Sequence, residues 1–172
     1  MNGLLPVSRK RERGVALVMA MVFLMLLTIV ALASVNSSSL EEKMAGNTQD
    51  RNIAFQAAET ALVKAEEWIR TQPSAPATAS PSTGLYDPSS TTTPVWNTAN
   101  LWTSANVVRY PCTPTTPSGC GTGLERVGTQ PKYIIEIMGV AGSNRVFRIT
   151  ARGTGASDNS VVMLQSTFIR IP

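Results

Sequence analysis

A basic stub followed by a long uncharged run constrains this chain more than any other feature. Residues 9–13 carry four basic side chains and one acidic side chain, and twenty-one uncharged residues, 15–35, follow Gly14. As a helix these residues span roughly 30 Å, which is the thickness of the hydrocarbon core of a bilayer. Because basic residues that flank such a helix stay on the cytoplasmic side, we expect everything after residue 35 to lie outside the cytoplasm.

Three interpretations of this junction remain open when the segment is taken by itself. The first is an uncleaved membrane anchor that carries an exported domain. The second is a secretory signal peptide, since Ala31-Leu32-Ala33 has the small-x-small form of a cleavage site and a cut there leaves Ser34 as the new N-terminus. The apolar run is longer, however, than the usual about 7–15 residues of such a signal. The third is a leader cut after Gly14, which keeps the apolar helix on a mature protein that begins at Val15.

The residues around and after the apolar run favour the third interpretation. Residues 14–18, 41–47 and 54–62 resemble the N-terminal region of PilX-type minor pilins of type IV pili. Residues 147–155 and 161–167 are similar to the last strands of the same family. The resemblance implies cleavage after Gly14 by a prepilin peptidase, N-methylation of Val15, and incorporation into, or priming of, a pilus.

Two positions depart from the common pilin pattern. Position 15 is Val, where most pilins begin with Phe, and the fifth mature residue is Met19, where most carry Glu. In major pilins this Glu neutralises the N-terminal amine of a neighbouring subunit, and a buried amine without a partner is costly. By analogy with the tip pseudopilin of type II secretion, which also lacks it, we interpret the chain as a low-copy subunit at or near the tip or in the initiating complex. The alternative is that Met19 is only another lipid-facing apolar residue.

The charge of the chain argues against a nucleic-acid partner. Most of the formal net charge of +4 belongs to the stub, because residues 15–172 hold 11 basic and 10 acidic residues. A nucleic-acid-binding protein keeps its positive charge on the folded domain. We therefore expect no nucleic acid among the partners, and we interpret Arg145, Arg148 and Arg152 as a solvated face. The 172 residues suffice for one core of ordinary size.

A long helix with a weak point is predicted for the first part of the chain. Within the apolar half, Leu17, Val18, Leu24 and Leu27 are expected to carry helix packing. Beyond it an apolar stripe recurs at spacings of three and four, which is typical of an amphipathic helix; its members are Leu40, Met44, Phe55, Ala58, Leu62, Ala65 and Ile69.

The boundaries of this helix follow from small and polar residues. Gly46-Asn47 is expected to interrupt the helix, with Asn47 or Thr48 capping a restart. Gln72-Pro73 is expected to end it, because the residue before Pro is pushed out of helical geometry. An Ala-rich face permits close approach of another element, so packing on a sheet is expected rather than a bare stalk; this face comprises Ala54, Ala57, Ala58, Ala61 and Ala65.

The stretch after the helix is rich in Pro, Ser and Thr. Between residues 73 and 94 only Leu85 and Tyr86 are large apolar anchors, so the segment is interpreted as a slack loop, with a loop that displays an interaction surface as the alternative. Trp96 and Trp102 follow and are interpreted as core anchors that tie the loop to a sheet. An exposed aromatic patch for adhesion is the alternative for these two residues.

The two cysteines predict a disulfide. Cys112 and Cys120 lie in one short loop, and an isolated pair outside the cytoplasm is usually joined. The chain has no His, so a Cys/His zinc site is excluded, and two residues, Asp158 and Asn159, are too few to hold a cation. We expect no metal, no cofactor and no catalytic residue, since none of the few lysines lies in a recognisable nucleophile motif and Glu41 and Glu42 point to different sides of a helix.

The last part of the chain reads as an antiparallel sheet. Alternating patterns predict strands over residues 133–138, 147–152 and 161–171, with a short fourth strand at 107–110. A long helix followed by such a meander gives a pilin-like α+β fold in which the amphipathic half of the helix packs on the sheet. The sheet edges are expected to be able to pair with neighbouring subunits.

The sequence thus predicts a structural minor pilin that helps to initiate a type IV pilus. Its expected partners are other minor and major pilins, the prepilin peptidase, the inner-membrane assembly machinery and the membrane. It is expected in the bacterial inner membrane with its C-terminal domain in the periplasm, and afterwards in the extracellular pilus. The alternative function is a membrane-anchored or secreted adhesion or binding domain unrelated to pili. The expected parts are a cleaved leader (1–14), a membrane or filament-core helix (15–35), an amphipathic helix (36–72), a loop (73–106) and a sheet (107–172) with a disulfide loop at 112–120.

Overall fold

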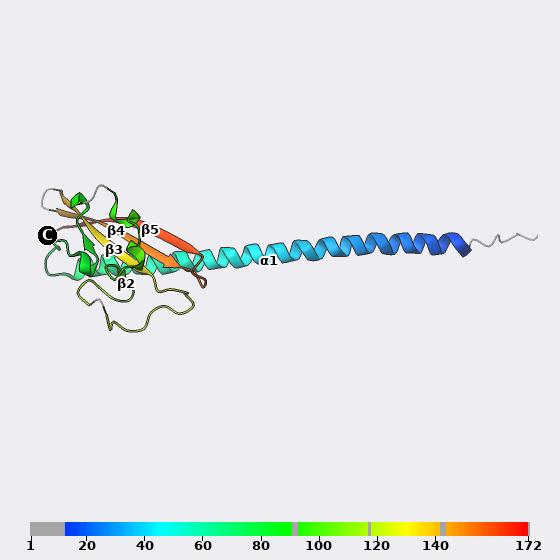
Figure 1. Ribbon diagram of the computed structural model, residues 1–172, viewed down its shortest axis with the longest axis horizontal. Helices are drawn as coiled ribbons and strands as arrows, with labels where there is room; N and C mark the ends of the chain where they lie inside the picture. Colours follow the sequence, from blue (N-terminus) through cyan, green and yellow to red (C-terminus); the bar gives the residue numbers. More distant parts are fainter. Residues whose placement is uncertain (1–12, 91–92, 117, 142–143, 172) are drawn as a thin grey trace, which may run out of the picture. The chain divides into compact units, whose positions relative to one another are not determined.

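One long helix and a small sheet make up this α+β protein, as predicted (Figure 1). The computed structural model describes residues 13–90, 93–116, 118–141 and 144–171. The elements found there are α1 (Arg13–Thr71), β1 (Leu85–Tyr86), β2 (Val108–Arg109), β3 (Lys132–Ala141), β4 (Asn144–Thr154) and β5 (Val161–Arg170). Short 3-10 helices lie between α1 and β2, at Pro81–Thr83, Pro88–Ser90, Val95–Asn97 and Leu101–Thr103. The chain divides into two compact units, and the boundary between them in the chain lies between Ala45 and Gly46.

Helix α1 is continuous through the point where a break was expected. It runs without interruption from Arg13 to Thr71, so the predicted interruption at Gly46-Asn47 and the restart capped by Asn47 or Thr48 are wrong. Gly and Asn lower helix propensity by only about 1 kcal/mol or less each, and the residues on both sides continue the hydrogen-bond ladder. Helix formation is cooperative, so two weak residues inside a long helix do not end it. The helix ends immediately before Gln72-Pro73.

The C-terminal end of α1 is held by a residue that the sequence did not single out. Arg170 of β5 donates from Nη1 to the carbonyl oxygen of Ile69 at 2.6 Å and from Nη2 to that of Gln72. The last carbonyl groups of a helix have no partners within the helix, and a cation is favoured there. Arg170 therefore caps α1 from the far end of the sheet.

The sheet is mixed rather than wholly antiparallel. Its order is β1-β3-β4-β5, and β2 also pairs with β3. The β3–β4 and β4–β5 pairs are antiparallel, as expected, but β1 pairs with β3 in parallel, with Leu85 opposite Ile135. Strand β1 comes from the segment interpreted as slack, so that interpretation is wrong for these residues. A two-residue strand in a Pro- and Ser-rich stretch shows no periodicity from which its pairing could be predicted.

The main core lies between α1 and one face of the sheet. Figure 1 shows the sheet lying across the C-terminal part of α1. The Ala-rich face of α1 is buried, as predicted. The buried side chains of this core are Ala61, Ala65, Trp68, Ile69, Leu85, Val108, Cys112, Tyr133, Ile135, Phe147, Ile149 and Ala151.

A second, smaller cluster covers the opposite face of β3. Val95 and Leu101 pack on Ile134, with Trp96 and Trp102 half-buried beside them. The indole N–H of Trp102 donates to the carbonyl oxygen of Trp96 at 3.1 Å. The two tryptophans therefore tie the segment before β2 to the sheet, which is the anchoring role predicted for them.

Helix and sheet approach closely at the end of β4. A methyl group at Gly153 would overlap with the carbonyl oxygen of Ala54 and the amide nitrogen of Ala58, and one at Gly155 would overlap with the Asp50 carboxylate. Backbone therefore lies directly on backbone here, without intervening side chains. Alanine on the helix and glycine on the strand are the residues that allow this contact.

Gly153→Ala should destabilise the fold, because neither backbone can move away without disturbing its own hydrogen bonds. Overpacking of this kind costs about 1–3 kcal/mol, and unfolding of the detergent-solubilised chain in denaturant measures it. Gly46→Ala is the matched control: nothing lies within 4 Å of a methyl group there, and Ala stabilises a helix interior by about 0.5–1 kcal/mol relative to Gly. Equal stability of the two variants would contradict the close contact.

Candidate functional site

The first half of α1 presents an apolar surface that no described residue of its own unit covers. Between Val15 and Val35 the large apolar side chains are 49–68 % exposed in the isolated chain. Burying one such side chain fully is worth about 1.5–3 kcal/mol relative to water, so a surface of this size requires a lipid or protein environment. In the part of the chain that the structure describes, α1 is the one helix long and apolar enough to cross a membrane.

The predicted processing and packing residues all lie on this helix. Gly14 and Val15 fall in the first turn of α1 and are exposed. The predicted packing residues are also exposed, and they are Leu17, Val18, Leu24 and Leu27. Leu17 and Leu24, seven residues apart, lie along one line of the helix, and the other two flank that line on opposite sides. Leader cleavage, methylation and packing at these positions remain predictions.

Thr28 carries the single hydroxyl group between residues 15 and 33, and that group is satisfied within the helix. Its Oγ1 donates to the carbonyl oxygen of Met25 at 2.7 Å. A hydroxyl in hydrocarbon costs several kcal/mol when unpaired, and a bond to the preceding turn removes most of this cost. Thr28 was not predicted from the sequence to have a role, although a lone Thr in an apolar helix is a recognisable candidate for such a bond. The apolar surface therefore carries no unpaired hydroxyl in this stretch.

Met19 is 57 % exposed and offers no charge to an amine at Val15. The first carboxylate after Val15 is Glu41, twenty-six residues along the chain. At 1.5 Å per residue this places Glu41 about 39 Å away along the helix. A charged amine at Val15 therefore cannot be neutralised by a carboxylate of its own helix.

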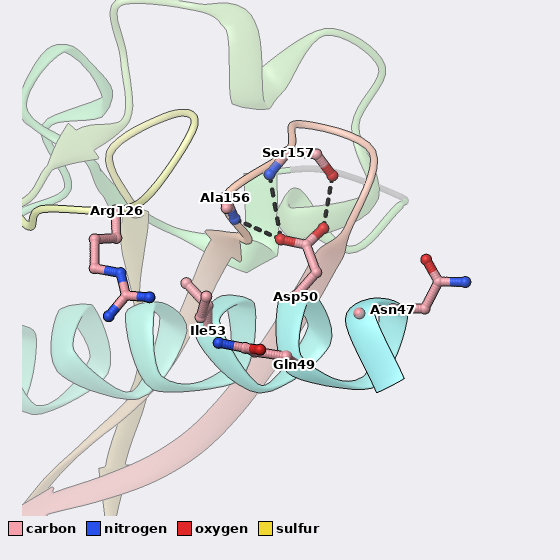
Figure 2. Close-up of a pocket in the computed structure, with 8 residues that line it drawn as sticks. Asn47, Gln49, Asp50, Ile53, Arg126, Ala156 and Ser157 are labelled. Carbon is pink, nitrogen blue, oxygen red and sulfur yellow. Dashed lines mark hydrogen bonds between the residues drawn. The ribbon is translucent and has the colours of Figure 1, made fainter. Parts of the chain in front are cut away.

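Within the second unit, Asp50 fastens α1 to the turn between β4 and β5. Figure 2 shows its carboxylate pointing at this turn. Oδ1 accepts from the amide nitrogens of Ala156 at 2.6 Å and Ser157 at 3.2 Å, and Oδ2 accepts from the Ser157 hydroxyl at 2.6 Å. The Ser157 hydroxyl, followed by the two amides, lowers the pKa of Asp50, although desolvation opposes this shift. A turn that seemed only a connection in the sequence is thus tied to the helix.

The surface around Asp50 is an open, polar depression rather than an enclosed pocket. A hollow of about 520 Å³ is lined by Gln49, Asp50, Ile53 and Arg126, among others, and Figure 2 shows Arg126 extending toward α1. The nearby Asp158 accepts from the Thr129 hydroxyl at 2.6 Å. Among the described residues no group of three or more Cys, Asp or Glu side chains is arranged to hold a metal.

Arg148 is not part of a solvated face, which corrects that interpretation. Its Nε and Nη2 donate to the two carboxylate oxygens of Glu136, each at 2.7 Å, and Glu136 is fully buried. These hydrogen bonds raise the pKa of Arg148. The residues are cross-strand partners on β3 and β4. Alternation along each strand was visible in the sequence, but their pairing required the register of the two strands.

The predicted disulfide between Cys112 and Cys120 is present. Closing so short a ring stabilises the fold by about 2–3 kcal/mol on the chain-entropy account. The loop is held at two further points: the buried Tyr133 hydroxyl donates to the carbonyl oxygen of Cys112 at 2.9 Å, and the indole of Trp68 donates to Thr115 at 3.2 Å. Burial raises the pKa of Tyr133, so this hydroxyl stays protonated and can donate.

Asp50→Asn should remove an acid-dependent part of the stability. Because the folded pKa lies below the ordinary value of 3.8, the contribution of the carboxylate is present above pH 3.8 and is lost as the pH falls through the lower folded value. The difference in unfolding free energy between wild type and variant should therefore shrink on acidification below 3.8. Denaturant unfolding across this range measures it. Ser157→Ala, which keeps the carboxyl but removes its main donor, should reduce the effect; a difference that does not change with pH would contradict it.

Comparison with known families gives two matches that together cover most of the chain. Residues 13–63 match the family described as PilX N-terminal, and residues 73–170 match the one described as type IV pilus assembly protein PilX C-term. No curated protein and no solved structure matches the chain significantly. The second match includes the middle segment, residues 73–131, where the sequence by itself suggested no relationship.

Proposed function

This chain belongs to the PilX family of type IV pilus proteins, and we propose that it is a structural minor pilin that helps to initiate a type IV pilus and lies at or near its tip. Family membership supports a minor pilin that associates with other pilins. The finer placement rests on Met19. A subunit that offers no carboxylate at this position fits best where no neighbouring amine has to be neutralised, which is at an end of the filament.

The same helix serves the proposed function in two environments. Before assembly, residues 15–35 hold the chain in the inner membrane, with the leader in the cytoplasm and residues 46–172 in the periplasm. After the prepilin peptidase removes residues 1–14, the inner-membrane machinery transfers the helix into the filament, where it packs against other pilins. The apolar surface and the satisfied hydroxyl of Thr28 suit both environments.

A structural role leaves no step for catalysis, so we do not propose an enzyme. The alternative of an adhesion or binding domain unrelated to pili loses its support, because the chain belongs to a pilus family. Measuring the N-terminus of the mature chain distinguishes a pilin, a secreted domain and a plain membrane anchor. A mature pilin begins at Val15, a secreted domain at Ser34, and a plain anchor at Met1.

The mature chain should begin at Val15, with or without a methyl group, when its N-terminus is measured by mass spectrometry of native membranes and sheared filaments. Gly14→Val should leave the chain starting at Met1, because the side chain obstructs the peptide bond that the peptidase must reach. Gly3→Val introduces the same side chain far from this bond and should be processed normally. A wild-type chain that begins at Ser34 would rule out prepilin processing.

Met19→Glu should increase the amount of this chain in sheared filaments relative to the major pilin. The added carboxylate supplies the partner that a neighbouring N-terminal amine requires, so insertion along the filament becomes less unfavourable. Met21→Glu places the same charge two residues away on a different side of the helix and should not do so, since an unpaired carboxylate in an apolar segment is costly. Quantitative mass spectrometry of sheared filaments measures the ratio of this chain to the major pilin. Equal ratios for Met19→Glu and wild type would contradict the proposal that Met19 keeps the chain at an end of the filament.

A further inference from the structure

Strand β5 forms an open edge of the sheet. All ten of its residues pair with β4, from Val161 opposite Thr154 to Arg170 opposite Arg145. On its other side, no strand among the residues that the structure describes pairs with it. An edge strand presents a row of backbone N–H and C=O groups that can pair with another strand.

This edge lacks the features that usually prevent pairing with other chains. Residues 161–169 contain no charged residue and no Pro, and the register with β4 is continuous without a bulge. The guanidinium group of Arg170 points to the end of α1, where it donates hydrogen bonds to the carbonyl oxygens of Ile69 and Gln72. Natural edge strands are normally short, charged, bulged or covered, whereas β5 is ten residues long, carries its one charge at its last residue and has no bulge in its pairing with β4.

The side chains on the outer face of β5, the face that points away from α1, add an exposed surface beside this open edge. The outward row is apolar at both ends and polar in the middle, where Gln165 and Thr167 lie. The exposed fractions of its apolar members are 40 % for Val161, 40 % for Met163 and 55 % for Ile169, and Ile171, directly after the strand, is 74 % exposed. Met163 and Gln165 also line a shallow groove of about 230 Å³ together with Trp96 and Thr150. An added strand would therefore find apolar contacts beside the hydrogen-bonding edge.

The direction of β5 limits which chain can supply that strand. Asp50 contacts Ser157, Glu66 contacts Ser166, and Ile69 contacts Arg170. Both members of these pairs increase in residue number together, so β5 runs in the same direction as α1. Two copies joined through their β5 strands about a two-fold axis would be antiparallel, so residues 46–71 of their α1 helices would run in opposite directions. The two Gly46 ends, from which each chain continues to its residues 15–35, would then lie at opposite ends of the pair, so a second copy joined in this way is disfavoured when both chains are held in one membrane.

We propose that the free edge of β5 is completed by an extended strand from a different pilin subunit of the same assembly. The proposal rests on the function proposed above and names the contact through which the chain would join its neighbours. Backbone hydrogen bonds supply the affinity in this mode of recognition, and alternate side chains supply the specificity. The incoming strand is therefore expected to be uncharged in its centre and to place apolar side chains beside Met163 and Ile169.

Photo-crosslinking of the full chain in native membranes tests this contact. The crosslinking amino acid p-benzoylphenylalanine replaces Thr167 on the exposed outer face of β5, and, as the control, Thr122 in an exposed loop. Directly opposed residues on neighbouring strands lie about 4.5–5.5 Å apart, within reach of the probe. The expected result is a crosslinked product from position 167, absent from position 122, whose attachment site maps by mass spectrometry to a strand of another pilin.

Two outcomes would overturn the proposal. A product that joins position 167 to a second copy of this chain would show that the occupant is wrong, and a yield no higher than that of the Thr122 control would show that the edge is unoccupied. Failure of the proposed function is distinguishable, because it would appear as an unprocessed N-terminus or as normal piliation without this chain, whatever the crosslinks show.

A second variant separates strand pairing from mere proximity. Gln165→Lys places a charge on the outer face of the edge and should lower the crosslink yield from position 167 by about tenfold, since charged edge residues oppose strand addition. Thr122→Lys adds the same charge away from the edge and should leave the yield unchanged. Membrane levels of the chain and its disulfide should be the same in both variants. An undiminished yield in Gln165→Lys would contradict pairing through the backbone of β5.

Discussion

Direct backbone contact between α1 and the end of β4 is the constraint on which the rest of the globular unit depends. Where Ala54 and Ala58 meet Gly153, no side chain separates the two elements, and a single added methyl group would overlap with main-chain atoms. This approach sets the distance between helix and sheet, so the large side chains farther along, such as Phe147 and Ile149, fill the space that remains. Small residues at one end and large residues at the other therefore act together: the small ones position the layers, and the large ones supply most of the buried apolar area.

Polar contacts hold this packing in register along the whole length of the interface. Asp50 binds the turn before β5, Glu66 accepts from the Ser166 hydroxyl at 2.6 Å in the middle, and Arg170 binds the carbonyl groups at the end of α1. Each contact joins residues about one hundred positions apart in the chain. Sliding of the helix along the sheet would break all three contacts. Together they hold the helix in one position on the sheet, so this single helix supports the sheet although one edge strand is open.

The two units of the chain meet different physical demands. The described part of the first, residues 13–45, is helix without a core of its own, and its exposed apolar side chains suit a membrane or the company of other subunits. The second has a hydrophobic core, a disulfide and an ion pair between Arg148 and the buried Glu136, and one side of its β5 pairs with no other strand among the described residues. Membership of a pilus family explains why one chain carries both: the helix is suited to anchoring and filament packing, while the folded unit presents surfaces to neighbouring subunits.

Features governed by local periodicity and composition were decided by the sequence alone. The charge boundary at Gly14, the end of the helix before Pro73, the three long strands and the bond between Cys112 and Cys120 depend on residues close together in the chain, so their patterns could be read directly. Predictions from the sequence were wrong where weak local signals were overruled or where residues distant in the chain came into contact. Helix cooperativity carried α1 through Gly46. The arrangement and register of the strands decided the parallel pairing of β1 and the partner of Arg148, and the packing of α1 on the sheet decided the role of Arg170. Tertiary structure alone determines such contacts, because they depend on which strands become neighbours, and no spacing within a single segment records that choice.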